Sequence, residues 1–134
     1  MVAWGRNMIS RETFFEKGRL ATVRLVLRDA QADQPGLFVD LLFASSGIET
    51  EIAADAERIE VIPGITMPVA RTGHLMALKA LAGRAQDLAD FEALARVADE
   101  TEIARARSAA RLIVERSFAR GKALENELER LLEK

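Results

Sequence analysis

The spacing of apolar residues changes once along this chain, near residue 71, and the change limits the folds open to it. Before it, short runs rich in apolar residues lie between turn residues, which is typical of strands. After it, apolar residues recur every three or four positions, which is typical of amphipathic helices. Strands followed by helices predict an α+β fold: a small, mainly antiparallel sheet of about three to four strands, then a four-helix array. We expect a single domain over 1–134, strand-rich at 1–70 and helical at 71–134.

The strand-rich part contains one clear hairpin. Residues 20–28 alternate in polarity, as a half-buried strand does, and 37–43 form an apolar run typical of a strand buried on both faces. A polar connection with Pro35 and Gly36 joins them, which predicts antiparallel pairing. A short helix is expected at 48–56 and further strands at 58–62 and 67–70. Residues 1–17 have no clear period, and we assign no element to them.

Helix signals follow in order. Thr72 is the expected N-cap of a helix over 73–82 that stops at Gly83, and a second helix is expected over 86–98. Asp99 and Glu102 have capping-box spacing and predict a long helix to about residue 118. Gly121 interrupts the pattern, and a last helix carries one apolar face, formed by Leu124, Leu128, Leu131 and Leu132.

Composition excludes several classes of function. The net charge of −2 is spread over many charges of both signs and gives neither a nucleic-acid footprint nor a membrane-binding patch. The sequence has no cysteine, so disulfides, zinc–thiolate sites and thiol nucleophiles are excluded. No apolar run approaches the roughly 20 residues of a membrane span, and no signal peptide is recognised at the N-terminus. We expect a cytoplasmic protein.

Asp40 is the first candidate site residue, because it interrupts the apolar run 37–43. A buried carboxylate is costly unless a metal or a cation compensates its charge, and such residues cluster at functional sites. Phe38 and Leu42 share its face and favour burial. The alternative is a half-exposed strand in which Asp40 points to water.

Lys79 is the second misplaced charge, since it falls on the apolar arc of the helix over 73–82. It either extends its amine to water or faces a cleft and meets an anion, a phosphate or a carboxylate. Arg71 and Arg84 flank this helix and either add positive charge near Lys79 or are ordinary surface residues.

Asp87 and Asp90 open the following helix. The helix dipole explains Asp87 well and Asp90 less well, and their spacing of three places both on one side, where they could share a cleft. His74, the only histidine, has no zinc partner and is expected to satisfy local backbone groups. Ser45-Ser46-Gly47 lacks the nucleophile-elbow pattern and is expected to form a turn. The combination of an acid on a strand, a lysine on a helix and two acids on the next helix favours a site that binds a metal ion and a phosphate.

The segments that carry these residues also resemble a known family. Residues 39–49, 68–70, 73–79 and 86–90 occur in the same order as motifs of bacterial nucleotidyltransferases of the AbiEii type, in the polymerase-beta-like superfamily. Some members are toxins of toxin–antitoxin pairs. The resemblance covers about residues 18–120.

The resemblance implies roles for the candidate residues. Asp40 would be the third carboxylate of the Mg²⁺ site and would help to activate the acceptor hydroxyl. Lys79 would lie near the phosphates of a nucleoside triphosphate, and Asp87 and Asp90 would form a D-x-x-D motif. The family also carries a glycine-rich turn and a D-x-D pair on a preceding strand. No such segment precedes Leu20, so the chain resembles the C-terminal part of the family.

Three functions follow as hypotheses. The first is a degenerate or partial nucleotidyltransferase-like protein, inactive alone, that binds a nucleotide or a partner chain. The second is an active nucleotidyltransferase whose other half is supplied separately, and the third is an oligomerising interaction module without catalysis. We expect self-association as a dimer, with Trp4, Phe14 and Phe15, or the stripe Leu124–Leu128–Leu131, as contacts. The nucleotide, the acceptor and the pathway are not specified by the sequence.

Overall fold

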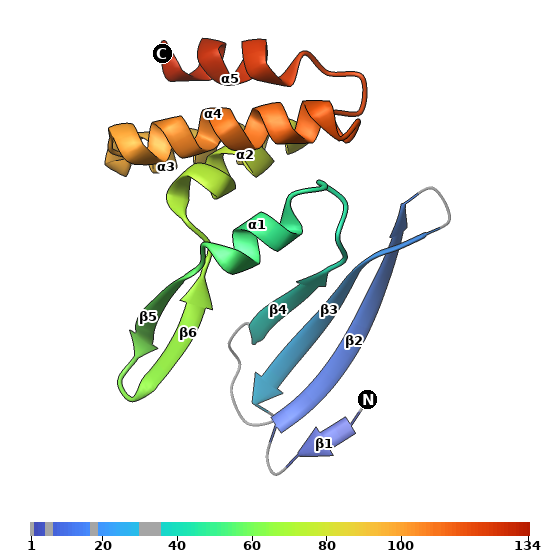
Figure 1. The fold of residues 1–134 in the computed structure, drawn as a ribbon. Helices are drawn as coiled ribbons and strands as arrows, with labels where there is room; N and C mark the ends of the chain where they lie inside the picture. Colours follow the sequence, from blue (N-terminus) through green and yellow to red (C-terminus); the bar gives the residue numbers. More distant parts are fainter. Residues whose placement is uncertain (1, 5–6, 17–18, 30–35) are drawn as a thin grey trace. The chain divides into compact units, whose positions relative to one another are not determined.

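The chain folds as two compact units, Met1–Ala44 and Ser45–Lys134, in a computed structural model. The structure describes residues 2–4, 7–16, 19–29 and 36–134 (Figure 1). Both units contain antiparallel strands and the second also contains the helices, so the α+β class is confirmed. The division falls after Ala44, so the second strand pair belongs to the same unit as the helices. No helix in the described ranges is long and apolar enough to cross a membrane.

The first unit is a four-stranded sheet. Strands β1 (Val2–Trp4), β2 (Asn7–Glu16), β3 (Arg19–Asp29) and β4 (Leu37–Leu42) lie in chain order, and each is antiparallel to the next. The expected hairpin is confirmed, since β3 and β4 pair with Arg24 opposite Asp40. Leaving 1–17 without an element was wrong, because β1 and β2 occupy this segment. Strand β2 shows no clean alternation because its described residues 11–15 are all exposed, so neither face is selected to be apolar.

Strand β4 differs most from expectation. A strand buried on both faces was predicted, yet all six of its residues are exposed. Phe38 and Leu42, whose shared face favoured burial of Asp40, are 52% and 79% exposed. That premise is therefore wrong. Apolar composition identifies this strand correctly but not its environment.

The second unit begins with the short helix α1 (Glu49–Ala54) and a hairpin of β5 (Glu57–Ile62) and β6 (Ile65–Val69). Both strands were expected, but they form a sheet of their own, so the single sheet was wrong. Helices α2 (Thr72–Ala82), α3 (Ala85–Val97), α4 (Glu100–Glu115) and α5 (Leu124–Leu132) follow and confirm the helical array. Helix α4 contacts both α2 and α5, and α2 also contacts α3 (Figure 1).

Helix ends agree with the sequence signals in part. Gly83 ends α2 in the left-handed conformation, at φ +67°, as a glycine after a helix commonly does. Thr72 is not the N-cap, since Arg71 holds that position. Asp99 caps α4 by accepting a hydrogen bond from the Glu102 amide at 2.9 Å. The Glu102 carboxylate instead accepts one from the Gly73 amide at 2.7 Å, which joins α4 to the start of α2.

Gly73 marks the closest approach of two helices. A Cβ at this position would lie 2.2 Å from the carbonyl oxygen of Glu102, so only glycine lets α2 and α4 meet here. The helices then pack through small residues such as Ala77, Ala106 and Ala110, all of which are buried. Close packing of this kind maximises dispersion contacts between the backbones.

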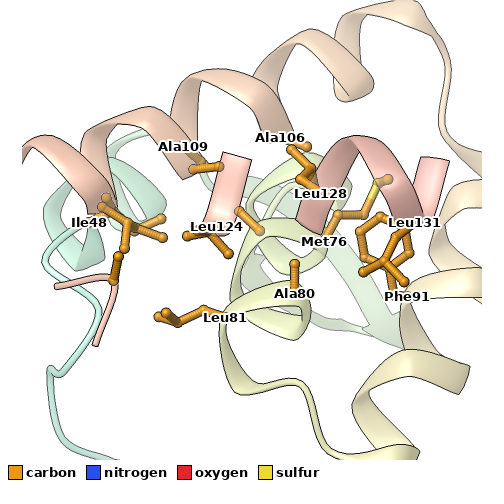
Figure 2. Close-up of a cluster of buried hydrophobic side chains, with 14 residues drawn as sticks. Ile48, Met76, Ala80, Leu81, Phe91, Ala106, Ala109, Leu124, Leu128 and Leu131 are labelled. Carbon is orange, nitrogen blue, oxygen red and sulfur yellow. The ribbon is translucent and has the colours of Figure 1, made fainter. Parts of the chain in front are cut away.

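Among the described residues, the main cluster of buried apolar side chains lies in the second unit, while Val26 of β3 is buried in the first. Leu124, Leu128 and Leu131 of α5 are buried in this cluster, and each contributes roughly 1.5–3 kcal/mol of transfer free energy (Figure 2). The expectation that this stripe is free for a partner is therefore wrong. The core comprises Ile48, Met76, Ala77, Ala80, Leu81, Phe91, Ala106, Ala109, Ala110, Ile113, Ala119, Leu124, Leu128 and Leu131.

Candidate functional site

Asp40 is paired with an arginine of the neighbouring strand. Arg24 of β3 lies opposite it and donates from Nε to Oδ1 at 2.7 Å and from Nη2 to Oδ2 at 2.8 Å. Hydrogen bonding and the arginine charge lower the pKa of Asp40, and the same pair raises the pKa of Arg24. The Asp40 side chain is 34% exposed, so it is neither deeply buried nor free in water. A cation of its own sheet compensates its charge.

Two aromatic rings frame the Arg24–Asp40 pair. The guanidinium carbon of Arg24 lies 5.7 Å from the ring centre of Phe14 and 5.6 Å from that of Phe38. At such distances the negative faces of the rings attract the cation, by about 0.5–1 kcal/mol each at an exposed site. The rings and the carboxylate together hold the guanidinium in one position. Strands β2, β3 and β4 each supply part of this arrangement.

Lys79 meets two carboxylates of the next helix. Its ammonium on α2 lies 3.2 Å from Oδ1 of Asp87 and 2.7 Å from Oδ2 of Asp90, both on α3. The hydrogen bond to Asp90 is the largest cause of the raised pKa of Lys79. Of the two sequence interpretations, the structure supports an anion partner for Lys79, and that anion is supplied by the chain. The common side of Asp87 and Asp90 faces this lysine.

Arg84 is bound to Asp87 and adds no free positive charge beside Lys79. Its Nε donates to Oδ2 of Asp87 at 2.6 Å, and its backbone amide donates to the same oxygen at 3.3 Å. Asp87 therefore also caps the start of α3, where the helix dipole favours a negative charge. The Arg84 hydrogen bond, followed by that from Lys79, lowers the pKa of Asp87 to about 2. We call Lys79, Arg84, Asp87 and Asp90 the α2–α3 charge cluster.

The predicted Mg²⁺ site can be tested against these bonds. Magnesium binds carboxylate oxygens at close to 2 Å. Both oxygens of Asp40, Asp87 and Asp90 already accept hydrogen bonds from side chains of this chain, Gln86 supplying the last one at 2.8 Å. Across the described ranges, no three acidic or histidine side chains converge in a geometry suited to a metal ion. A magnesium ion would have to compete with these hydrogen bonds, and the Mg²⁺ site stays a prediction.

The nucleotide role of Lys79 meets a similar obstacle. Two carboxylates already neutralise its ammonium, so a phosphate would have to compete with both of them. Arg84 is likewise bound to Asp87. Asp40 belongs to the unit Met1–Ala44 and the charge cluster to the unit Ser45–Lys134, and each unit is described by itself. A cleft shared by Asp40 and Lys79 stays a prediction.

The second unit forms a cleft beside His74 that the sequence analysis did not predict. It has a volume of about 320 Å³ and is lined by residues from α1, α2 and α4, among them Asp55 at the end of α1. Nδ1 of His74 is buried and has no hydrogen-bond partner in the described part of the chain, and Nε2 lies 3.9 Å from Asp55. The expectation that His74 satisfies backbone groups is therefore wrong for Nδ1. Only the isolated histidine at a helix start pointed to this position.

The Ser45–Gly47 segment bends the chain as expected and is held by a carboxylate of the helix that follows it. The Glu49 carboxylate accepts hydrogen bonds from both serine amides at 2.7 Å and from the Ser46 hydroxyl at 2.8 Å. These donors hold the pKa of Glu49 at about 2, against the opposing effect of burial. The Ser46 hydroxyl is thus tied to a carboxylate whose low pKa makes it a weak base.

Comparison with known proteins adds no relative, since neither a family model nor a curated protein matches the sequence. The nucleotidyltransferase resemblance accordingly stays a prediction from the motifs.

Proposed function

We propose that this chain is a partial nucleotidyltransferase-like protein that does not transfer nucleotides alone and acts by binding a protein chain. The family assignment rests on the order of the sequence motifs. The observation that carries the rest is that each acid assigned a catalytic role is held by a cation of the same chain: Asp40 by Arg24, and Asp87 and Asp90 by Lys79. Two-metal transfer requires several free carboxylates around both ions.

Protein binding is favoured over nucleotide binding by the surface chemistry. The cations available to phosphate in the α2–α3 charge cluster are already paired, whereas β4 exposes a row of apolar side chains: Leu37, Phe38, Val39, Leu41 and Leu42. Exposed apolar patches of this kind mark contact sites between proteins. The proposed partner is a second copy of the chain, so the active form is a dimer.

Transfer assays test the absence of catalysis. The purified chain is incubated with each of four labelled nucleoside triphosphates, Mg²⁺ or Mn²⁺, and RNA or protein acceptors. We expect no incorporation by wild type, Asp40→Asn or Lys79→Met. Incorporation by wild type that is lost in Asp40→Asn would restore the active enzyme.

Light scattering coupled to size exclusion tests the binding role. At micromolar concentration the mass is expected to be twice the chain mass of 14.8 kDa. A uniform 14.8 kDa species across this concentration range would contradict the dimer. A second experiment distinguishes nucleotide binding from protein binding. The chain is titrated with a nucleoside triphosphate while the NMR chemical shift of the Lys79 side chain is recorded. We expect no change in this shift for wild type.

A further inference from the structure

The cleft beside His74 has the size and the lining of a site for a small molecule. Its volume of about 320 Å³ lies within the range of roughly 300–1,000 Å³ that ligand sites occupy. Apolar side chains, among them Ile48, Ala109 and Leu112, line part of it, and a few polar groups line the rest. All of these residues belong to the unit Ser45–Lys134. Apolar walls combined with few polar groups are typical of sites that bind small organic molecules.

His74 and Asp55 form the polar wall of this cleft. His74 is 4% exposed, and its Nε2 lies 3.9 Å from Oδ2 of Asp55, too far for a hydrogen bond. Asp55 is half exposed, and Arg105 binds the same Oδ2 at 2.8 Å. Oδ1 of Asp55 accepts no side-chain hydrogen bond from the described residues. The wall therefore offers a carboxylate oxygen and an imidazole nitrogen to a ligand.

The charges around this wall favour a cation. They comprise four acids and three arginines, namely Glu51, Asp55, Glu57 and Glu102, with Arg71, Arg105 and Arg116. Each arginine is already in an ion pair with one of these acids, so one negative charge remains in excess. The carboxylates of Asp55, Glu102 and Glu51 favour a positive charge at His74, but burial lowers the pKa of His74 and keeps its ring neutral near pH 7. A bound cation can supply the charge that the imidazole does not carry.

We propose that this cleft binds a small organic amine in its ammonium form. The ammonium donates to the carboxylate of Asp55 and to Nε2 of His74, and the aliphatic part of the amine packs against Ala109 and Leu112. An ammonium has three donors and no acceptor, so one group can serve both acceptors of the wall. The imidazole then carries its proton on Nδ1. A metal ion is less suited, because no three acidic or histidine side chains in the described ranges converge on one point.

NMR titration tests the class of ligand. His74 is the only histidine, so its ring gives the one imidazole signal of the chain. The full chain is titrated at pH 7.5 with n-hexylammonium, and with n-hexanol and n-hexanoate as ligands that have the same stem. The ammonium is expected to shift this signal saturably, with a Kd roughly tenfold or more below that of either control, as a charge-assisted hydrogen bond implies. Equal Kd values, or no saturable shift with the ammonium, would overturn the proposal.

A lysine side chain of a peptide carries the same ammonium and a similar stem. Nα-acetyl-lysine N-methylamide separates this source from a free amine. We expect the lysine compound to bind more weakly than n-hexylammonium, because its two amide groups would leave water beside apolar walls. Tighter binding of the lysine compound would overturn the free amine as the ligand.

Two substitutions test the site itself. Asp55→Asn removes the charge and keeps the shape of the side chain, and it is expected to raise the Kd for n-hexylammonium roughly tenfold or more. Glu92→Gln is the matched control, because it removes one acid from an exposed position of α3 that does not line the cleft. Ala104→Leu fills part of the cleft without a change of charge and should also abolish binding. An unchanged Kd in Asp55→Asn or in Ala104→Leu would overturn the site.

Circular dichroism verifies that the variants fold, and if Asp55→Asn does not, Ala104→Leu decides. The site goes beyond the proposed function and can be tested separately from it. Saturable amine binding by a chain that light scattering shows to be a monomer would support the cleft and contradict the dimer. A dimer that does not bind n-hexylammonium would overturn the cleft alone.

Discussion

The ammonium of Lys79 lies 3.2 Å from the carboxylate of Asp87, and only 3% of that aspartate side chain is exposed. The pair joins α2 to α3 on one side of the core, and Asp87 also caps α3. Asp87 therefore stabilises the fold in two ways, through its ion pair with Lys79 and by capping the first turn of α3. Asp90, bound to the same lysine, is 37% exposed and is expected to contribute less.

Replacing the two acids separately tests this difference. Asp87→Ala is expected to lower the free energy of unfolding by about 2–3 kcal/mol, somewhat below the cost of breaking a fully buried pair, since Lys79 and Arg84 both reach water. Asp90→Ala is expected to lower it by about 1 kcal/mol or less. Urea unfolding followed by circular dichroism measures both. Equal losses would contradict the role given to burial.

Acid should weaken the same ion pair. The pKa of Asp87 is about 2 in the folded chain against an ordinary value of 3.8, so its contribution is present above about pH 4 and is lost as pH falls toward 2. The shift corresponds to about 2 kcal/mol. The free energy of unfolding, measured between pH 5 and pH 2 for wild type and Asp87→Asn, should fall less steeply in the variant. Parallel curves would assign the acid sensitivity to other carboxylates.

His74 predicts a second pH dependence, in a different range. Burial lowers its pKa below 6.5, so the unfolded chain takes up the proton more readily than the folded chain. Stability should therefore decrease as pH falls from 7.5 through 6.5, and the decrease should level off below the folded pKa. His74 is the only histidine, so His74→Gln should remove most of the slope in thermal unfolding over this range. An unchanged slope would show that His74 is not responsible.

Gly47 is expected to tolerate no side chain. Its φ is +77°, and a Cβ would lie 2.5 Å from the ring of Phe118. Gly121 has nearly the same φ, +78°, but no atom within 4 Å of a Cβ. Gly121→Ala should therefore cost only the left-handed conformation, about 1–2 kcal/mol, and Gly47→Ala distinctly more. Urea unfolding measures both variants. Equal unfolding midpoints for Gly47→Ala and Gly121→Ala would show that the Phe118 ring moves aside freely.

Residues 45–134 are expected to fold without the rest of the chain. Every member of the main buried cluster among the described residues lies within this unit, and helices α2 to α5 contact one another there. A fragment of 45–134 should give a cooperative thermal transition and a helical circular dichroism spectrum. A non-cooperative transition would show that the first unit supplies stabilising contacts.

Local signals predicted the helices well because their causes are short in range. Gly83 ends a helix through its own conformation, and Asp99 caps one through an amide three residues away. Leu124, Leu128 and Leu131 follow the helical period because one face is buried. In each case the stabilising contact lies within a few residues, or on one face of a helix. Such contacts leave a local pattern of residues that can be recognised in the sequence.

The strands and the site were predicted less well because their causes lie on other elements. The partner of Asp40 is 16 residues earlier, on β3, and only the register of the hairpin brings the two together. The alternation of 20–28 already placed Arg24 on a definite face of its strand. Counting residues back from the connecting loop could then have placed Arg24 opposite Asp40. Glu102 had capping-box spacing, yet its carboxylate binds the amide of Gly73 on another helix, which no local pattern encodes.

The position of the main buried cluster in the second unit bears on how such a sequence can change over time. Substitutions in α2, α4 or α5 alter buried packing, so selection for folding restrains them directly. The side chains of β4 are exposed, so selection for folding restrains them little. Their sequence should change rapidly unless a binding partner contacts them. Slow divergence of β4 among relatives would therefore report recognition by a partner and not a requirement of folding.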